Sequence, residues 1–419
     1  MGRGLRLMVV AALGAGMLTA SPAIGDGNAP NGHWVDTWTA MPQLTEPHNM
    51  PPAPYTTGDL VMADSTLRQT VRVSAGGQRV RLRFSNAFGG APLPITRVTV
   101  AYPDGGRAGV SAIRPGTARP VTFHGRPATI VPVGAQVVSD PLDLPLPPGS
   151  VLAVTVYLAE GQASSAITSH PGSRTTSYLA KGNQADAGDL TGATPVDHWY
   201  FLSAIEVWSK RSTAALVLLG DSLTDGRGST TNLNNRWPDQ LFDRLGRSGP
   251  AIANQAAGGN RVLNDGLGPA ALARLDRDVL ARSGAEWLIV FEGVNDIGTA
   301  QPTQDAQKKV ADELIAAYDQ IIVRAQARGL VVYGATLTPF GGHSYDDPQG
   351  LREATRQAVN DWIRTSGRFD GVIDFDQAVR DPADPRRLPA AYDVGDGLHL
   401  SPAGYKALAD AVPARLFRR

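Results

Sequence analysis

The sequence predicts an all-β domain followed by an α/β domain with a parallel sheet. Two observations carry this prediction. From about residue 30 to 209 the chain is rich in Pro, Gly, Thr and Val, and short alternating segments recur between turn residues. From about 212 to 419, apolar strands alternate instead with amphipathic helices. We therefore expect one domain over 30–209 and a second over 212–419.

The first domain is expected to be an antiparallel β-sandwich. Period-two alternation of apolar and polar residues is typical of strands with one buried face. Turn residues such as Gly76-Gly77 bound these segments, so neighbouring strands can pair antiparallel. We expect no helix in this part of the chain. The expected strands include 67–75, 78–88, 96–102 and 151–160.

The second domain is expected to bury a parallel sheet beneath helices on both of its faces, because helices connect parallel strands. In such sheets, binding sites lie at the carboxyl ends of the strands, and both Ser222 and the segment 293–296 directly follow an expected strand. The expected strands are 214–220, 285–293, 330–339 and one within 369–378, and the expected helices are 235–246, 305–329 and 350–367.

The N-terminal residues indicate where the protein acts. Residues 1–23 are typical of a secretory signal peptide, because Arg3 and Arg6 precede a short apolar run that ends in Ser21-Pro22-Ala23. An N-terminal membrane anchor is the alternative, but the run is short for a span, and no other stretch approaches the roughly 20 apolar residues needed. We expect an exported protein, extracellular or periplasmic, with no integral membrane segment once the signal is removed.

Charge and cysteine content exclude several classes of function. The 419 residues include 39 basic and 39 acidic side chains, so no excess of positive charge indicates a nucleic-acid partner. The chain has no cysteine, which excludes a cysteine nucleophile and a thiolate zinc site. The protein is therefore expected to fold without disulfides.

A serine follows the first strand of the second domain. The apolar residues 216–219 run directly into Gly220-Asp221-Ser222. A plain turn would explain these residue types, since all three are common turn formers. The chemical interpretation is that the strand delivers Ser222 to the sheet edge as a nucleophile. Acyl transfer would then also need a histidine base, a carboxylate that orients it, and N–H donors for an oxyanion.

Three further segments carry groups of these types. Asp396 and His399 lie on one short stretch, DGLH, so the acid and the imidazole can meet locally. Ser401-Pro402 predicts the N-cap and the first position of the next helix. Gly259, in AAGGN, has no side chain and can present its N–H to a ligand. Asn295, in GVND, could cap a helix or donate its side-chain amide.

Together these motifs resemble those of the SGNH (GDSL-type) hydrolase family. The marks of the family are a serine in G-D-S, a glycine after a second strand, an asparagine in G-x-N-D and a terminal D-x-x-H. GDSL (220–223), Gly259, GVND (293–296) and DGLH (396–399) occur here in that order. The resemblance covers roughly residues 212 to 419. It implies a flavodoxin-like three-layer α/β/α fold and hydrolysis of esters, usually without metal.

The resemblance also implies a role for each residue. Ser222 would be the nucleophile and would give its backbone N–H to the oxyanion hole. The backbone N–H of Gly259 and the side-chain amide of Asn295 would complete that hole. His399 would act as base and then as acid. Asp396 would orient His399 and raise its pKa somewhat.

Other polar residues near these motifs are assigned structural roles. Asp221 and Asp225 are expected to fix the serine turn by hydrogen bonding, with substrate contact as the alternative. Asp296 is expected to be structural, and Trp237 is expected to pack. The remaining histidines are scattered without HxH or HExxH spacing, so the sequence predicts no metal and no other cofactor.

The motifs predict carboxylic ester hydrolysis and leave the substrate open. Expected export and the added β-sandwich favour a carbohydrate esterase that acts on acylated polysaccharide or oligosaccharide, as in family members that resemble xylan esterases. A secreted lipase or lysophospholipase is the alternative, although no long apolar lid segment is evident. A non-catalytic carbohydrate-binding protein is a third hypothesis, which the intact set of site residues disfavours. Acyl chain length, the role of the β-sandwich and the oligomeric state stay open.

Overall fold

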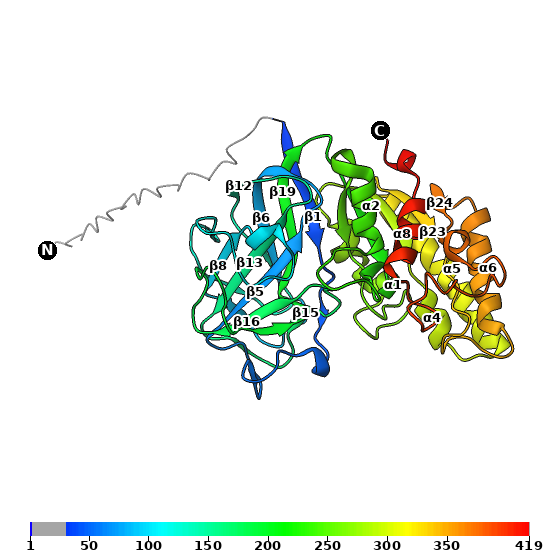
Figure 1. Ribbon diagram of the computed structural model, residues 1–419, viewed down its shortest axis with the longest axis horizontal. Helices are drawn as coiled ribbons and strands as arrows, with labels where there is room; N and C mark the ends of the chain where they lie inside the picture. The colour runs from blue at the N-terminus through cyan, green and yellow to red at the C-terminus, as the bar shows by residue number, and fades with distance from the viewer. Residues whose placement is uncertain (2–30, 419) are drawn as a thin grey trace.

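The computed structural model describes residues 1 and 31–418, and it consists of an all-β part followed by an α/β part (Figure 1). Antiparallel sheets occupy residues 32–210, and a five-stranded parallel sheet with helices follows. The fold class predicted from the sequence is therefore confirmed. The expected signal peptide, 1–23, lies outside the described residues.

Two large antiparallel sheets build the β part. The first contains β1 (Gly32–Thr39), β19 (Leu202–Lys210), β6 (Gly77–Ser85), β11 (Gln136–Val138) and β12 (Leu142–Leu146). The second contains β17 (Thr194–Val196), β16 (Ser177–Lys181), β5 (Ser65–Arg72), β13 (Val151–Leu158), β8 (Arg97–Ala101) and β9 (Arg119–Val121). Buried side chains from both sheets, such as Leu82 and Val154, share one hydrophobic core, as in a sandwich.

Three small sheets complete the β part. The one that matters for the site contains β18 (Trp199–Tyr200), β15 (Thr168–His170) and β2 (Gln43–Leu44). The others contain β14 (Gln162–Ala163), β4 (Leu60–Val61) and β3 (Thr56–Thr57), and β10 (Thr129–Val131) and β7 (Leu93–Ile95). The four strands expected from the sequence correspond to β5, β6, β8 and β13. As expected, residues 31–210 contain no α-helix.

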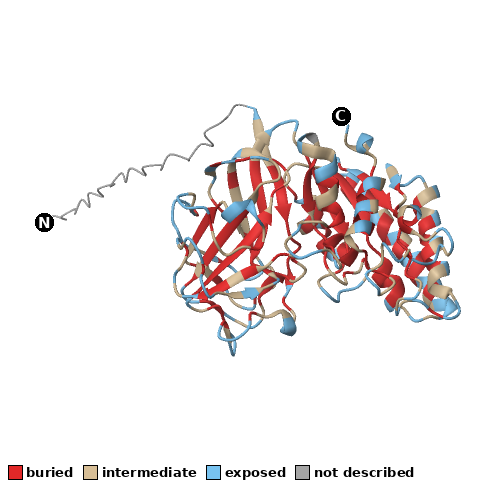
Figure 2. Ribbon diagram, in the orientation of Figure 1, coloured by how far each residue is buried: buried red, intermediate tan, exposed pale blue. Residues whose placement is uncertain are grey.

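The parallel sheet has the order β21, β20, β22, β23, β24. Its strands are β20 (Ala215–Gly220), β21 (Ala251–Asn254), β22 (Ala285–Phe291), β23 (Val331–Ala335) and β24 (Gly371–Ile373). Strands β20 and β22 are almost wholly buried (Figure 2). The chain leaves β20 toward β21 on one side and returns to β22 on the other. The carboxyl end of β20 is therefore a topological switch point, where open α/β sheets form their ligand crevices.

Helices cover both faces of this sheet and give the α/β/α arrangement. They are α1 (Ser222–Asp225), α2 (Trp237–Leu245), α3 (Ala271–Leu275), α4 (Val294–Thr299), α5 (Gln304–Gln326), α6 (Leu351–Thr365), α7 (Phe375–Val379) and α8 (Pro402–Ala411). Helices α2 and α7 pack on α8, and α5 packs on α6. No helix in the described part of the chain is both long enough and apolar enough to cross a membrane.

The strand expected within 369–378 is β24, and a short helix that was not predicted follows it. Strand β24 ends at Ile373, and the Asp374 side chain accepts a hydrogen bond from the Gln377 N–H at the start of α7. This N-cap ends the strand, because a capped first turn competes with extended backbone. Trp237 packs as expected: it is fully buried and its ring lies edge-on against Phe375.

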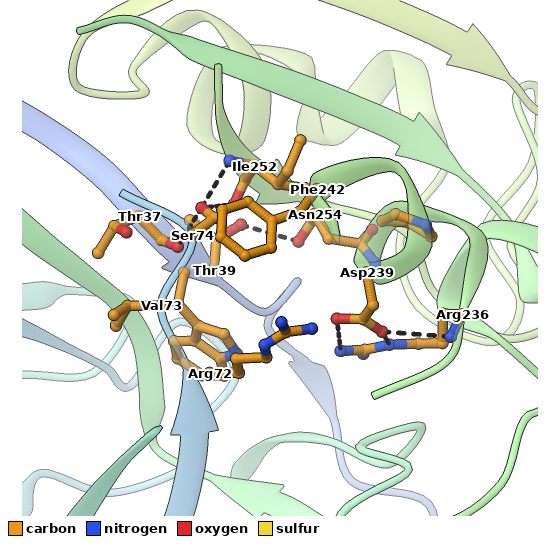
Figure 3. A pocket seen from close by; sticks show the side chains of 12 residues that line it. Thr37, Thr39, Arg72, Val73, Ser74, Arg236, Asp239, Phe242, Ile252 and Asn254 are labelled. Atoms are coloured by element: carbon orange, nitrogen blue, oxygen red, sulfur yellow. Dashed lines mark hydrogen bonds and ion pairs between the residues drawn. The ribbon is translucent and has the colours of Figure 1, made fainter. Parts of the chain in front are cut away.

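The β part packs directly on the α/β part. The Thr39 hydroxyl donates to the carbonyl oxygen of Asn254 at 2.8 Å, and the Ile252 N–H donates to the Ser74 hydroxyl at 2.7 Å (Figure 3). A pocket of about 40 Å³ lies at this contact and contains none of the predicted site residues. The contact holds the two parts together close to β21, one of the strands that border the carboxyl end of β20.

Candidate active site

Ser222 is the first residue of α1, the single helical turn that follows β20. Asp221 is the N-cap, and its carboxylate accepts from the Leu223 N–H at 2.9 Å, as the sequence predicts. A side chain at position 220 would lie within 2.6 Å of the Thr224 hydroxyl, so only glycine allows this close approach. Gly226, with φ of 93°, ends the turn. The local residues therefore place the Ser222 side chain at the carboxyl end of β20.

The Ser222, His399 and Asp396 side chains form a continuous hydrogen-bonded chain. The Ser222 Oγ lies 2.9 Å from His399 Nε2, and His399 Nδ1 lies 2.7 Å from Asp396 Oδ2. Since an ionised carboxylate only accepts, Nδ1 carries the proton and the neutral ring presents an unprotonated Nε2 to Ser222. This arrangement suits removal of the serine proton by the imidazole.

Local hydrogen bonds hold the loop that carries the acid and the histidine. The Asp393 carboxylate accepts from the N–H groups of Gly395 and Gly397 at 2.8 and 3.0 Å. Asp396 Oδ1 in turn accepts from the His399 N–H at 2.8 Å. Ser401 caps α8 and Pro402 begins it, as the sequence predicts. The loop is thus fixed on both sides by short-range contacts.

The pKa of His399 differs from the sequence-based expectation. Burial lowers it below the usual 6.5, and the positive charge of Arg227 adds to this effect, although Asp396 acts in the opposite direction. The expectation that Asp396 raises the pKa overall is therefore wrong, because desolvation of the imidazolium outweighs the pairing. For Asp396 itself burial acts upward, but hydrogen bonds from the N–H and the ring of His399 lower its pKa to about 2.

This direction sets the expected pH dependence. The histidine must be neutral to accept the serine proton, so kcat/KM should fall as pH drops through the pKa of His399. Because that pKa is lowered, the half-maximal point should lie below pH 6.5, with a plateau through pH 7 to 8. A profile with p-nitrophenyl acetate, an uncharged substrate, measures this. Arg227→Gln should move the midpoint upward, and a wild-type midpoint above pH 7 would contradict the assignment.

Gly259 and Asn295 line the same cleft as Ser222 and His399. Gly259 has a φ of 70°, and a Cβ there would lie 2.4 Å from Leu267, so the position requires glycine. The Asn295 side chain accepts from the Tyr345 hydroxyl at 2.9 Å and donates to the carbonyl oxygen of Asn260 at 2.8 Å. One amide N–H of Asn295 then has no acceptor among the described residues.

Asn295 does not cap its helix. Gly293 holds the N-cap position of α4, with φ of 139°, and Asn295 lies within the first turn. The capping alternative is therefore wrong. Tyr345, which fixes the orientation of the amide, was not identified from the sequence, because it lies 50 residues further along the chain and carries no motif.

Replacement of Asn295 tests whether its amide serves an oxyanion. Asn295→Ala is expected to lower kcat by roughly 10²- to 10³-fold with little change in KM, because the negative charge develops only in the transition state. Steady-state kinetics on p-nitrophenyl acetate measures both constants. Tyr345→Phe, which keeps the amide, should have a smaller effect. A rise in KM alone would make Asn295 a substrate-binding residue instead.

Asp221, Glu292 and Asp296 form a buried acidic cluster beside the turn that carries Ser222, which we call the nucleophile turn. Burial raises the pKa of Asp221 to about 7 and that of Glu292 to about 8, and the negative charge of Asp296 adds to both shifts. Asp296 accepts from the N–H groups of Val262 and Leu263 at 2.8 and 3.0 Å. Asp296 thus has the structural role expected from the sequence.

Asp225 differs from expectation. Its carboxylate does not fix the serine turn: Oδ1 lies 2.9 Å from Nε2 of His170, a buried residue of the β part. Because Asp221 already caps the turn, the Asp225 side chain is available to bond to the β part. The other ring nitrogen of His170 lies 3.0 Å from the carbonyl oxygen of Met41. No sequence signal identified His170, which lies 55 residues away.

Both parts of the chain line the cleft, whose volume is about 460 Å³. The α/β part contributes Ser222, His399 and Asn295 with their neighbours. The β part contributes residues of 43–49 and 171–174, together with Asp197 and His198. Among the described residues, no group of three or more His, Asp or Glu side chains could hold a metal ion.

Comparisons with known proteins agree with the motifs. Residues 218–407 match the model of the GDSL-like Lipase/Acylhydrolase family. No curated protein matches the chain.

Similar solved structures include a putative lipolytic protein of the G-D-S-L family from Desulfitobacterium hafniense, at 19% identity over 48% of this chain and 97% of that one, with a TM-score of 0.36. They also include a lipase/acylhydrolase from Enterococcus faecalis, at 20% identity over 48% and 93%, with a TM-score of 0.36. An acetyl xylan esterase, AlAXEase, matches at 19% identity over 47% and 96%, with a TM-score of 0.35.

Proposed function

We propose that the protein is an exported serine esterase that removes acetyl or similar short acyl groups from carbohydrate. Residues 218–407 form a domain of the GDSL-like lipase/acylhydrolase family, so the chain is a carboxylic ester hydrolase. The observation that carries the proposal is the Ser222–His399–Asp396 chain of hydrogen bonds at the base of a polar cleft.

The proposed mechanism assigns one role to each group. The Ser222 oxygen attacks the ester carbonyl while His399 Nε2 takes its proton, and Asp396 stabilises the resulting imidazolium. The oxyanion accepts from the N–H groups of Ser222 and Gly259 and from the Asn295 amide. His399 then protonates the leaving alcohol, and a water molecule, activated by the same imidazole, hydrolyses the acyl-enzyme.

The lining of the cleft supports a short acyl group and a polar alcohol. Its aliphatic side chains are Leu267, Leu398 and Pro171, whereas most other lining residues are glycine, polar or charged. A long acyl chain would need a continuous apolar channel to bury its methylene groups, at about 0.8 kcal/mol for each. A sugar would instead find hydroxyl partners in groups such as Glu46 and His198. Export of the protein, expected from residues 1–23, would bring it to polysaccharide outside the cell.

An acyl-chain series tests the proposal. Activity on p-nitrophenyl esters should be highest for acetate and fall by about tenfold or more by octanoate, because the cleft offers little apolar surface. Acetate should be released from acetylated xylan or pectin, measured beside a Ser222→Ala control. If activity were highest on octanoate or a longer ester, a lipase would be favoured. If the wild-type protein hydrolysed none of these esters, a carbohydrate-binding protein would be favoured.

The proposed mechanism uses side chains and backbone N–H groups alone, so chelation should have no effect. Treatment of the protein with EDTA, followed by its removal, is expected to leave kcat/KM on p-nitrophenyl acetate unchanged. Inductively coupled plasma analysis of the same sample would report any bound metal. Loss of activity on EDTA treatment, with recovery on addition of zinc, would overturn the serine mechanism.

A further inference from the structure

We propose that Arg174 of the β part and Arg227 of the α/β part form an anion-binding subsite beside Ser222, which selects esters whose alcohol carries a carboxylate, such as an acetylated uronic acid. The inference rests on the proposed function, because it names the alcohol that this esterase would take. It also assigns the β part a share in substrate selection.

Neither guanidinium group has a hydrogen-bond or ion-pair partner within residues 31–418. Arg174 and Arg227 line the cleft together with Ser222 and His399. The Nε of Arg174 is buried without a hydrogen-bond partner, and no hydrogen bond or ion pair engages either guanidinium group among the described residues. A buried donor without an acceptor is costly, and a planar guanidinium matches a carboxylate through two parallel hydrogen bonds. Arg227 is exposed, so water reaches its donors, whereas a carboxylate in the cleft would supply the acceptor that the buried Nε of Arg174 lacks.

The contact between the two parts fixes the segment that carries Arg174. His170, at the end of β15, is hydrogen-bonded to Asp225 in the nucleophile turn. Two residues further on, a Cβ at Gly172 would lie 1.9 Å from Asp225 Oδ2, so only glycine lets the backbone pass this close. The segment 170–174 therefore lies directly against the turn that holds Ser222.

Arg174 itself is held in an unusual backbone conformation. Its φ is 50°, a region that non-glycine residues rarely adopt. The Asn232 N–H donates to the Arg174 carbonyl oxygen at 3.0 Å, and the Asn232 side chain accepts from the Thr176 N–H at 2.8 Å. The α/β part thus constrains the backbone on both sides of Arg174. Such conformations persist where the surroundings impose them, often at functional sites.

Arg227 directly follows the turn that carries Ser222 and lines the same cleft as Arg174. Its N–H donates to the Ser222 carbonyl oxygen at 3.0 Å, and its own carbonyl oxygen accepts from the Tyr405 hydroxyl at 2.6 Å. Its positive charge also helps to lower the pKa of His399. Arg227 is therefore close enough to the reacting groups to bind a neighbouring part of the substrate.

The cleft contains carboxylates as well as the two arginines. Glu46 and Asp197 belong to the β part, and Asp197 accepts from the Thr176 hydroxyl at 2.9 Å, two residues from Arg174. Asp225 also lines the cleft, and its carboxylate is paired with His170. The carboxylates of Glu46 and Asp197 would repel a polyanion but accept from sugar hydroxyls. A singly charged sugar fits this pattern better than a phosphorylated one.

Two matched substrates test the subsite. They are a monoacetylated methyl galacturonide and the equally acetylated methyl galactoside, with acetate release as the readout. Wild-type kcat/KM should be about 10- to 100-fold higher for the galacturonide, mainly through KM, because the arginines bind the carboxylate before and during reaction. In Arg174→Gln and Arg227→Gln this ratio should fall toward 1, and Arg174→Lys should keep part of it.

The matched control is Arg126→Gln, which removes the same charge from an exposed residue of the β part outside the cleft. It should keep the wild-type ratio. Thermal unfolding of each variant reports on folding. The ratio of kcat/KM for the galacturonide to that for the galactoside does not depend on the fraction of active protein, because both values come from the same sample. A wild-type ratio near 1, or equal loss on both substrates in Arg174→Gln, would overturn the inference and leave the proposed function intact.

A competition assay separates the inference from the proposed function. Methyl galacturonide should inhibit wild-type hydrolysis of p-nitrophenyl acetate at concentrations about tenfold or more below those needed with methyl galactoside, and Arg174→Gln should abolish the difference. If neither acetylated sugar is hydrolysed but this inhibition holds, the subsite stands and carbohydrate is the wrong substrate. If methyl galacturonide inhibits no better than methyl galactoside, the subsite is disproved.

Discussion

Replacement of Ser222 by alanine is expected to lower kcat for ester hydrolysis by about 10⁴- to 10⁶-fold. The hydroxyl is the only group at the carboxyl end of β20 that lies within hydrogen-bonding distance of His399 Nε2 among the described residues. Without it, no acyl-enzyme can form, and only the weak catalysis of the remaining oxyanion donors is left. Steady-state kinetics on p-nitrophenyl acetate measures the loss.

The fold should survive this change, because alanine keeps the backbone geometry of the turn. A matched control is Ser229→Ala, which removes a hydroxyl that has no hydrogen-bond partner in the described part of the chain and lies outside the cleft. That variant should retain near-native turnover. If Ser222→Ala also kept near-native turnover with an unchanged melting temperature, the assignment of the nucleophile would be wrong.

Asp396→Asn is expected to lower kcat by about 10⁴-fold while the loop keeps its shape. The asparagine oxygen can still accept from the N–H groups of Leu398 and His399, as Asp396 Oδ1 does. Its NH₂ group would then face His399 Nδ1, which would have to accept, and the ring proton would move to Nε2. In that tautomer Nε2 cannot take the serine proton, and the imidazolium loses its counter-charge.

Circular dichroism and thermal unfolding would separate this effect from misfolding. Asp410→Asn is the matched control, because that side chain is exposed on α8 and forms only a surface ion pair with Lys406. It should leave kcat within about twofold of wild type. An Asp396→Asn protein with more than a tenth of native activity would mean that another group orients His399.

The sequence predicted the elements whose stabilising contacts are local. The period of the apolar residues predicted the sheets and the long helices. The turn at Ser222 and the cap at Ser401 depend on side chains that bond to N–H groups two or three residues away. Asp396 likewise reaches His399 within one short loop, so the pattern DGLH was enough to pair them. The strand expected within 369–378 is present as β24, and only the short helix after it, capped by Asp374, was not predicted.

The roles of Gly259 and Asn295 came from a resemblance, because neither residue has a local partner that indicates its function. The tertiary structure placed both in the cleft with Ser222, and it supplied the Tyr345 contact that orients the amide. The same structure reversed the expected shift of the His399 pKa. The burial of His399 depends on residues from many distant parts of the chain, so no short stretch of sequence indicates it.

By itself, then, the sequence determined the fold class, the ester hydrolase motifs and the local pairing of Asp396 with His399. Only the tertiary structure decided that Asp225 bonds to His170, that the segment 170–174 lies against the nucleophile turn, and that Arg174 and Arg227 face one cleft. The physical reason is the range of the interactions. Periodicity, caps and turns act over a few residues, whereas contacts between the β part and the α/β part join residues far apart in the chain and carry no pattern that a linear reading detects.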